Sequence, residues 1–221
     1  MDAIRTFFRK FYWNYIIERI FDYICDVRLK DENKELIIRQ SAIEMIVNKG
    51  FDGLSMQKLA KKAKISASTI YVYFKSREDL LNKLFIEVQE KFEKDALNDF
   101  SADLNFEDGL WLQWKNRLKN ITKNPVNFQF HEQFRSSPLI NHKDIKPTIF
   151  RKVMNDFVEN AIRKEEIKDL PSEIFWAVAY GPFYILVQFH LNQATMSGKP
   201  FLLSEQKLKQ TFNLVLSALK K

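Results

Sequence analysis

The residues between Ser55 and Phe74 constrain the fold most, because they predict two short helices joined by a tight turn. Ser55 suits the N-cap of a first helix over Met56–Ala63, since a serine hydroxyl accepts a hydrogen bond from a free backbone N–H group. Ser66 is a second N-cap of the same kind, and the helix that it begins runs to about Phe74. The turn between them falls at Lys64-Ile65. Two helices of this size and spacing have the dimensions of a helix-turn-helix.

Positive charge is concentrated around these two helices. The chain of 221 residues has a formal net charge of +7, and the stretch from Lys49 to Arg77 alone nets +6, with Asp52 as its single acid. A local excess of this kind indicates a nucleic acid or an anionic membrane surface as partner. Because a helix-turn-helix lies in the same stretch, we expect double-stranded DNA.

Helical signals continue on both sides of this motif. An apolar period of three to four residues begins at Asn33 and ends at Lys49-Gly50, where the glycine suits a left-handed helix C-cap. Ser76 and Asp79 have the spacing of a capping box and begin a long helix to about Phe100. Alternations typical of strands are few. We therefore predict an all-α fold, with an N-terminal three-helix domain that contains the helix-turn-helix and a C-terminal helical domain.

The sequence offers no pattern of an enzyme, a metal site or a disulfide. Cys25 is the single cysteine, so an intrachain disulfide is excluded and a reducing cytoplasm is the expected location. His131, His142 and His190 are too dispersed for a metal signature, and His131 with Glu132 is better interpreted as a hydrogen-bonded pair. No glycine-rich phosphate loop, G-x-S-x-G elbow or paired carboxylates stand out. We expect no catalysis, no cofactor and no metal.

Two segments raise the question of a membrane. Residues 1–32 form an aromatic N-terminal extension of unclear role, in which charged residues interrupt every apolar run, so that no signal peptide is expected. This extension is either an additional helix that covers another surface or sequence that precedes the true start of translation. Residues 174–191 are uncharged and long enough to span a bilayer. Gly181-Pro182 and neighbouring polar residues favour a buried helix pair or a kinked helix, so we expect no membrane association.

The stretch from Gly50 to Leu81 has a more specific pattern. It reads Gly50-Phe51, then LSMQKLA over residues 54–60, then ISASTIYVYFKSREDLL over residues 65–81. This pattern resembles the DNA-binding domain of the tetracycline-repressor (TetR) family over about residues 33–84, and the run Tyr-x-Tyr-Phe-Lys-Ser-Arg-Glu-Asp-Leu is its strongest part. Lys64 departs from the family, which usually has glycine at this position of the turn. Because the position often needs a positive φ, we expect a slightly reshaped turn.

The resemblance implies which residues contact DNA. Residues at the start of the first short helix would meet the backbone or a base, residues of the second would form the face that reads bases in the major groove, and the residues after it would clamp phosphates. These three groups are Ser55 and Gln57; Ala67, Ser68, Thr69 and Tyr71; and Tyr73, Lys75 and Arg77. The second helix lacks Arg, Asn and Gln, the residues that make bidentate contacts to bases. Sequence specificity is therefore expected to depend on methyl contacts, on Tyr71 and Gln57, and on DNA shape. For Ile70 and Phe74 we expect burial in the core.

The resemblance also implies a role for the rest of the chain. Residues 33–78 would form the DNA-binding domain, and residues 79–221 the domain for ligand binding and dimerisation. An aromatic pocket with few charges would hold a lipophilic or aromatic effector. Its expected lining residues are Trp114, Phe130, Phe134 and Tyr184. The last two helices, about 172–193 and 204–219, would form a homodimer, with an apolar repeat of Leu208, Phe212, Val215, Leu216 and Leu219.

The function expected from the sequence is that of a sequence-specific transcriptional regulator. It would be a ligand-responsive repressor in the cytoplasm that binds a palindromic operator as a dimer. Two alternatives stay open at this point: a sequence-tolerant DNA-binding protein without an inducer, and a membrane-associated interaction protein.

Overall fold

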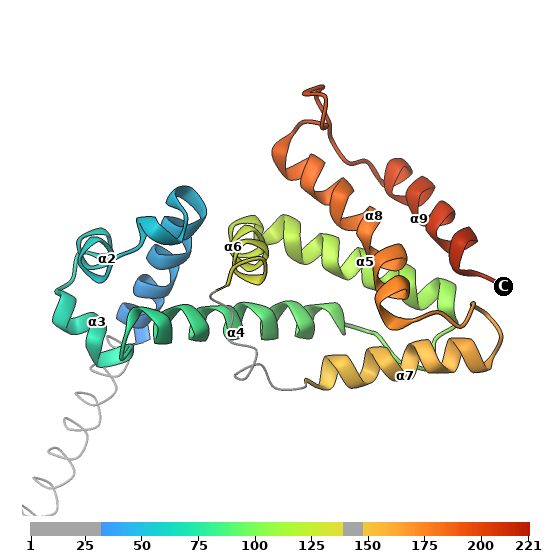
Figure 1. The fold of residues 1–221 in the computed structure, drawn as a ribbon, viewed down its shortest axis with the longest axis horizontal. Helices are drawn as coiled ribbons and strands as arrows, with labels where there is room; N and C mark the ends of the chain where they lie inside the picture. Colours follow the sequence, from blue (N-terminus) through green and yellow to red (C-terminus); the bar gives the residue numbers. More distant parts are fainter. Residues whose placement is uncertain (1–31, 139–147) are drawn as a thin grey trace, which may run out of the picture. The chain divides into compact units, whose positions relative to one another are not determined.

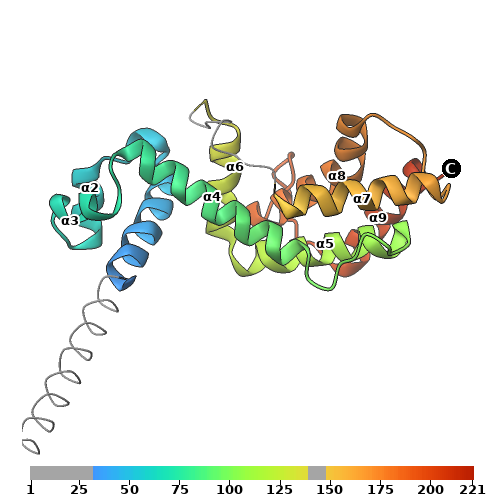
Figure 2. The same ribbon diagram turned by 90° about the horizontal axis from the view of Figure 1, so that it is seen from below.

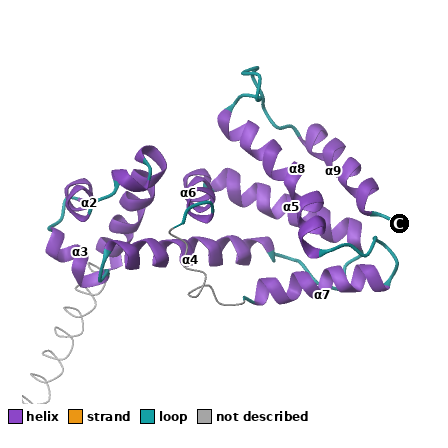
Figure 3. Cartoon of the chain, viewed as in Figure 1, coloured by secondary structure: helices purple, strands orange, loops and turns teal. Residues whose placement is uncertain are grey.

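The computed structural model describes residues 32–138 and 148–221 (Figure 1). Within these residues the chain forms helices and loops and no strand (Figure 3), and isolated bridges join Ile167 to Lys220 and Ala194 to Pro200. The predicted all-α fold is therefore confirmed. The expectations for residues 1–32 fall, apart from the last residue, outside the part of the chain that the structure describes.

Helices follow one another along the described parts of the chain. A helix over residues 32–49 is followed by η1 (Phe51–Gly53), α2 (Met56–Ala63), α3 (Ala67–Tyr73), α4 (Arg77–Ala96), α5 (Phe106–Lys123), α6 (Pro125–Arg135), α7 (Ile149–Arg163), α8 (Ser172–Asn192) and α9 (Glu205–Leu219). The chain divides into two compact units within α4, the first ending at Leu84 and the second beginning at Phe85. Because α4 belongs to both units, the bounds 33–78 and 79–221 stay predictions.

The first unit forms because each short helix has a cap and an apolar side. The Ser55 hydroxyl accepts a hydrogen bond from the Lys58 N–H group at 3.2 Å, and the Ser66 hydroxyl accepts one from the Thr69 N–H group at 3.1 Å. Both predicted N-caps are thus confirmed. Every α-helix of the unit contributes apolar side chains to a buried core, whose fully buried members include Ile38, Ala42, Ile46, Leu59, Ile70, Phe74 and Leu80.

Two turn residues in this unit have a positive φ. Gly50 has φ 68° and ψ 179°, so it is not the left-handed cap predicted from the sequence; its conformation is one that essentially only glycine adopts. Lys64 has φ 56° and ψ 41°, and the Ile65 N–H group donates to the Ala60 carbonyl at 3.0 Å. The expectation of a reshaped turn is wrong, because the lysine adopts the left-handed conformation itself.

The second unit is built around α5. Helix α5 contacts α6, α7 and α8, and α8 lies along α9 (Figures 1 and 2). The Trp114 indole of α5 is fully buried and donates to the Ala179 carbonyl of α8 at 3.0 Å. Its ring also contacts Phe183 and Phe212, at centroid distances of 5.2 and 5.3 Å. A large aromatic side chain with a satisfied N–H group therefore joins α5, α8 and α9.

Helix α8 is the one helix of the described residues that is long and apolar enough to cross a membrane. It is a single helix that runs through Gly181-Pro182, so of the two expected forms, a helix pair or a kinked helix, the helix pair is wrong. One side of the helix is buried in the core through Phe175, Ala179, Tyr180, Phe183 and Val187. The other side leaves Ile174 and Ile185 about half exposed.

The predicted dimer repeat in α9 has a different place in the structure. Leu208, Phe212, Val215, Leu216 and Leu219 are all buried in the core of their own chain. The apolar period correctly identified a buried side of the helix, but that side packs within the unit. The exposed apolar residue of α9 is Leu214, at 69%.

The conformation of Lys64 leads to a prediction for stability. A left-handed conformation costs a residue with a Cβ atom roughly 1–2 kcal/mol, and glycine loses part of this advantage through its greater freedom in the unfolded chain. We expect Lys64→Gly to raise the free energy of unfolding by about 0.5–1 kcal/mol, measured by urea denaturation. Lys61→Gly, inside α2, is the matched control and should lower it by about the same amount. A Lys64→Gly variant that is less stable than the parent would contradict this interpretation.

Candidate nucleic-acid interface and ligand cavity

The second helix of the helix-turn-helix, α3, has a buried side and an exposed side. Ile70 and Phe74 are fully buried, as expected from the sequence, whereas Tyr71 is 53% exposed. Of the other residues expected to contact DNA, Gln57, Ser68 and Lys75 are exposed, and five are half-buried: Ser55, Ala67, Thr69, Tyr73 and Arg77. An aromatic ring kept in solvent on a short helix is available to a partner. The contacts with DNA themselves stay predictions.

Val72 belongs to the same exposed region and was not predicted. Its side chain is 79% exposed, directly after Tyr71 in α3. Its exposure could have been predicted from its position in the helix, because helical periodicity places residue 72 on the side opposite the buried Ile70 and Phe74. Valine methyl groups suit contact with the methyl group of thymine. Val72 therefore extends the candidate DNA-reading face.

The start of α3 carries three hydroxyl groups that contact one another. The Ser66 Oγ lies 2.7 Å from the Ser68 Oγ and 2.7 Å from the Thr69 Oγ1. The same Ser66 oxygen also accepts from the Thr69 N–H group. Sequence reasoning treated Ser66 only as a cap, but it also orients the two hydroxyls expected to meet DNA.

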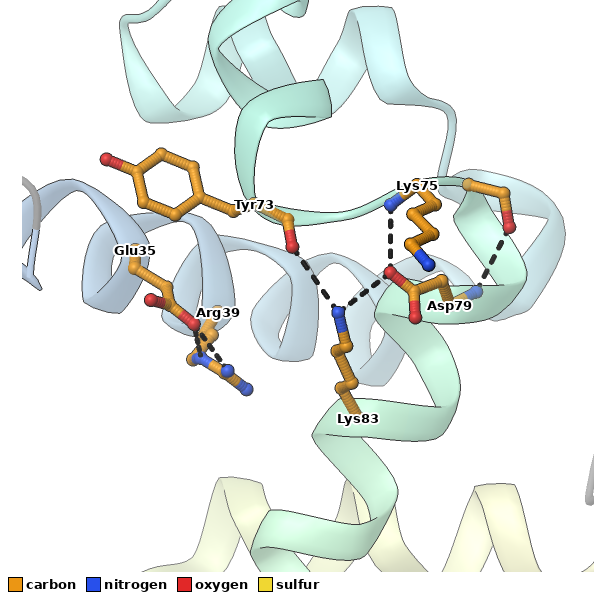
Figure 4. A network of polar contacts seen from close by, with 7 residues as sticks. Glu35, Arg39, Tyr73, Lys75, Asp79 and Lys83 are labelled. Carbon is orange, nitrogen blue, oxygen red and sulfur yellow. Dashed lines mark hydrogen bonds and ion pairs between the residues drawn. The ribbon is translucent and has the colours of Figure 1, made fainter. Parts of the chain in front are cut away.

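The segment after α3 is fastened to the start of α4 by Asp79 (Figure 4). One Asp79 carboxylate oxygen accepts from the Lys75 N–H group at 2.8 Å and from the Lys83 ammonium at 2.9 Å, and Lys83 also donates to the Tyr73 carbonyl at 3.4 Å. The Ser76 hydroxyl accepts from the Asp79 N–H group. In a capping box the acidic side chain would accept from the N–H group of the N-cap residue, Ser76. Here the Asp79 carboxylate accepts instead from the N–H group of Lys75, one residue earlier, so the predicted capping box is modified. Burial alone would raise the pKa of Asp79, but these hydrogen bonds hold it below its ordinary value.

Arg77 has an intramolecular role that the sequence did not reveal. Its Nη2 donates to the Phe51 carbonyl at 2.6 Å, and its Nε donates to the Leu54 carbonyl at 3.1 Å. The first residue of α4 is therefore joined to η1 and to Leu54, which follows it. The phosphate contact expected of Arg77 remains a prediction, and any such contact would have to use its remaining N–H donors.

The second unit contains a cavity of about 530 Å³. Of the predicted lining residues, Tyr184 lines it, whereas Trp114, Phe130 and Phe134 are fully buried in the core, so the prediction for these three is wrong. Trp114 packs against α8 and α9, and Phe134 packs against Phe85 and Phe130. The residues that do line the cavity are Phe85, Gln89, Phe92, Glu93, Arg117, Asn120, Ile121, Phe128, His131, Glu132, Arg135, Phe150, Arg151 and Tyr184.

This cavity is more charged than expected. His131 and Glu132 form the predicted pair, with the His131 Nδ1 3.5 Å from a Glu132 carboxylate oxygen, and Arg135 donates to the other oxygen at 3.1 Å. Burial would raise the pKa of Glu132, but the His131 hydrogen bond and the Arg135 charge outweigh it and lower this pKa. The expectation of few charges is wrong, because polar side chains of α4, α5 and α6 point into the same space as the aromatic ones.

Comparison with known proteins connects this architecture to a family. Residues 38–84 match the family described as bacterial regulatory proteins, tetR family. An HTH-type transcriptional regulator of Haemophilus influenzae is 30% identical over 135 residues, which cover 61% of this chain and 71% of the relative. The fatty acid metabolism regulator protein of Bacillus subtilis is 39% identical over 59 residues, 27% of this chain and 30% of that protein.

Solved structures extend the likeness over most of the chain. The crystal structure of a TetR family transcription regulator from Marinobacter aquaeolei has a TM-score of 0.75 at 24% identity, covering 87% of this chain and 98% of its own. A TetR-family regulator from Haemophilus influenzae has a TM-score of 0.69 at 23% identity, covering 86% and 98%. Together with the helix-turn-helix and the length of the shared sequence, these findings show that the chain belongs to the TetR family and is a DNA-binding transcriptional regulator.

Proposed function

We propose that the protein is a ligand-responsive repressor that binds a palindromic operator as a homodimer. The observation that carries this proposal is the exposed side of α3, where Tyr71 and Val72 lie in solvent while Ile70 and Phe74 anchor the helix. The local excess of positive charge around α2 and α3 supports DNA as the partner. As a DNA-binding regulator, the protein would act in the cytoplasm, without a catalytic role.

Reading of the operator would combine weak base contacts with strong backbone contacts. Helix α3 has no arginine, asparagine or glutamine for a bidentate contact to a base. The exposed Gln57, Tyr71 and Val72 would supply hydrogen bonds and methyl contacts, and Lys75 would meet phosphates. DNA shape would then contribute a larger share of specificity than in regulators with such a contact.

The outer side of α8 and α9 supports the proposed dimer. Ile174, Ile185 and Leu214 are exposed apolar residues on the two helices that lie along each other. Apolar residues on neighbouring helices that remain exposed in one chain suit a second copy of the same surface. This surface replaces the buried α9 repeat that the sequence suggested, and two-fold symmetry would match a palindrome.

The cavity supports an effector and favours a regulated repressor over a sequence-tolerant DNA-binding protein. Helix α4 begins in the DNA-binding unit, and its second half lines the cavity with Gln89, Phe92 and Glu93. An effector that binds more tightly to a DNA-incompetent state would shift the population away from the operator-bound state. We propose that α4 transmits this shift.

The proposed DNA-reading face is tested by selecting bound sequences from random DNA with the purified full chain. We expect a palindrome to be enriched, and Tyr71→Ala to weaken binding to it about tenfold, which is about 1.4 kcal/mol. Thr69→Ala should weaken binding in the same direction. Ile149→Ala, which removes an exposed side chain of α7 in the second unit, is the matched control and should bind like the parent.

Two outcomes of this selection would overturn the operator proposal. One is the absence of any enriched palindrome, which would favour the sequence-tolerant alternative. The other is parental affinity in both Tyr71→Ala and Thr69→Ala, since neither side chain would then take part in reading the DNA.

The proposed dimer is tested by the mass in solution, measured by light scattering. We expect the parent to have twice the 26.3 kDa of one chain. Leu214→Glu with Ile185→Glu should yield a monomer, because charges would be buried without partners at the interface. Operator affinity should then fall by about 100-fold through loss of bivalent binding. Met196→Glu, at an exposed loop position between α8 and α9, should stay dimeric. A monomeric parent, or a dimeric double variant, would refute this interface.

A further inference from the structure

Arg117 of α5 lies among uncharged groups at the cavity. Its Nη1 donates to the Tyr184 hydroxyl at 3.0 Å, and its Nη2 donates to the Gln113 side-chain oxygen at 3.3 Å. Its guanidinium carbon lies 4.7 Å from the ring centroid of Tyr180 and 5.4 Å from that of Phe150. Its Nε is buried without a hydrogen-bond partner. Among residues 32–138 and 148–221, no carboxylate forms an ion pair with this cation.

The carboxylates that line the same cavity have other partners. Glu132 is paired with His131 and Arg135, and Glu93 accepts a hydrogen bond from the Gln89 amide at 2.8 Å. The other two arginines at the cavity, Arg135 and Arg151, are exposed, so water screens their charges. Arg117 is half-buried and its Nε is fully enclosed, and removing a charge from water without a counter-ion is costly, since arginine stays protonated in proteins. Arg117 is therefore the least exposed arginine at this cavity, and no carboxylate of the described residues forms an ion pair with it.

A second donor lies beside Arg117. The Tyr180 hydroxyl is buried without a hydrogen-bond partner among the described residues. Burial raises the pKa of Tyr180 to about 12 despite the nearby Arg117, so the hydroxyl keeps its proton at neutral pH. Tyr180 does not line the cavity, so the Arg117 guanidinium is the donor of this pair that faces it, and a guanidinium suits an oxyanion.

Apolar surfaces complete the cavity. Phe92, Phe128 and Phe150 line it together with Ile121, and the rings of Phe128 and Tyr184 stack at a centroid distance of 6.1 Å. A ligand that satisfied Arg117 alone, such as an inorganic ion, would leave these aromatic walls uncovered. The chemistry of the cavity thus combines an arginine that has no ion-pair partner among the described residues with an apolar enclosure.

We propose that the cavity binds an amphipathic organic anion, with an apolar or aromatic body bearing a carboxylate or a similar oxyanion that pairs with Arg117. This inference rests on the proposed function, in which the cavity is the effector site, and it adds an anionic group to the lipophilic or aromatic effector expected from the sequence. The anionic group supplies the counter-ion that Arg117 lacks, and the body of the ligand lies against the phenylalanine rings.

The test compares two fluorescent probes that share one aromatic body. Both 8-anilinonaphthalene-1-sulfonate, an anion, and N-phenyl-1-naphthylamine, its uncharged counterpart, are titrated into the full-length protein without DNA. We expect the anion to bind at least about tenfold more tightly than the uncharged probe. Arg117→Met should remove this preference, and Arg117→Lys should keep part of it. Arg151→Met, which removes an exposed arginine at the same cavity, is the matched control and should keep the parental preference.

Equal affinity of the parent for the two probes would overturn the proposal, whether or not any variant folds. An unchanged preference for the anion in Arg117→Met would overturn it as well. Operator binding by the parent is measured separately in the absence of either probe. If operator binding fails while the preference for the anionic probe holds, the proposed repressor function is wrong and the proposed ligand class stands. If operator binding holds while the preference for the anionic probe is absent, the ligand class alone is rejected.

Discussion

The two hydrogen bonds from Arg77 to main-chain carbonyls hold the DNA-binding unit in its observed form. They connect the first turn of α4 with the carbonyls of Phe51 and Leu54, 26 and 23 residues earlier in the chain. Asp79 adds a local bond to Lys75, so the loop after α3 is held from both sides. The short α3 cannot be stable alone, since a helix of this length in water is marginal. Its exposed Tyr71 and Val72 are positioned by these contacts and by the buried Ile70 and Phe74.

The second unit uses one residue type for two purposes. Aromatic side chains fill the core between α5, α8 and α9, and others enclose the cavity beside Arg117. The difference lies in the polar neighbours, because Trp114 satisfies its N–H group within the core, whereas Arg117, which lines the cavity, retains an unpaired Nε donor. A core needs no unpaired donors, and a binding site for an anion does. The cavity is therefore identified by its unsatisfied polar atoms more than by its rings.

Sequence reasoning succeeded where an interaction is local and failed where it depends on packing. The caps at Ser55 and Ser66 follow from hydrogen bonds that span three residues, so their helix bounds were predictable. The conformation of Lys64 was not predictable in this way. The family usually has glycine at this position, so a lysine was expected to reshape the turn, whereas Lys64 adopts the left-handed conformation itself. Trp114, Phe130 and Phe134 were misassigned because composition does not distinguish a core ring from a cavity ring. The roles of Arg77 and Arg117 depend on partners from distant parts of the chain, which no spacing reveals.

The central claim is that the exposed side of α3 is the surface that meets the operator. Hydroxyl-radical footprinting of the full chain, read by mass spectrometry, tests it most directly, because it reports the solvent access of individual side chains. With the selected operator bound, Tyr71 and Val72 should lose most of their reactivity, while Ile149 on α7 should keep its own. Unchanged reactivity of Tyr71 and Val72 in the complex would contradict the claim.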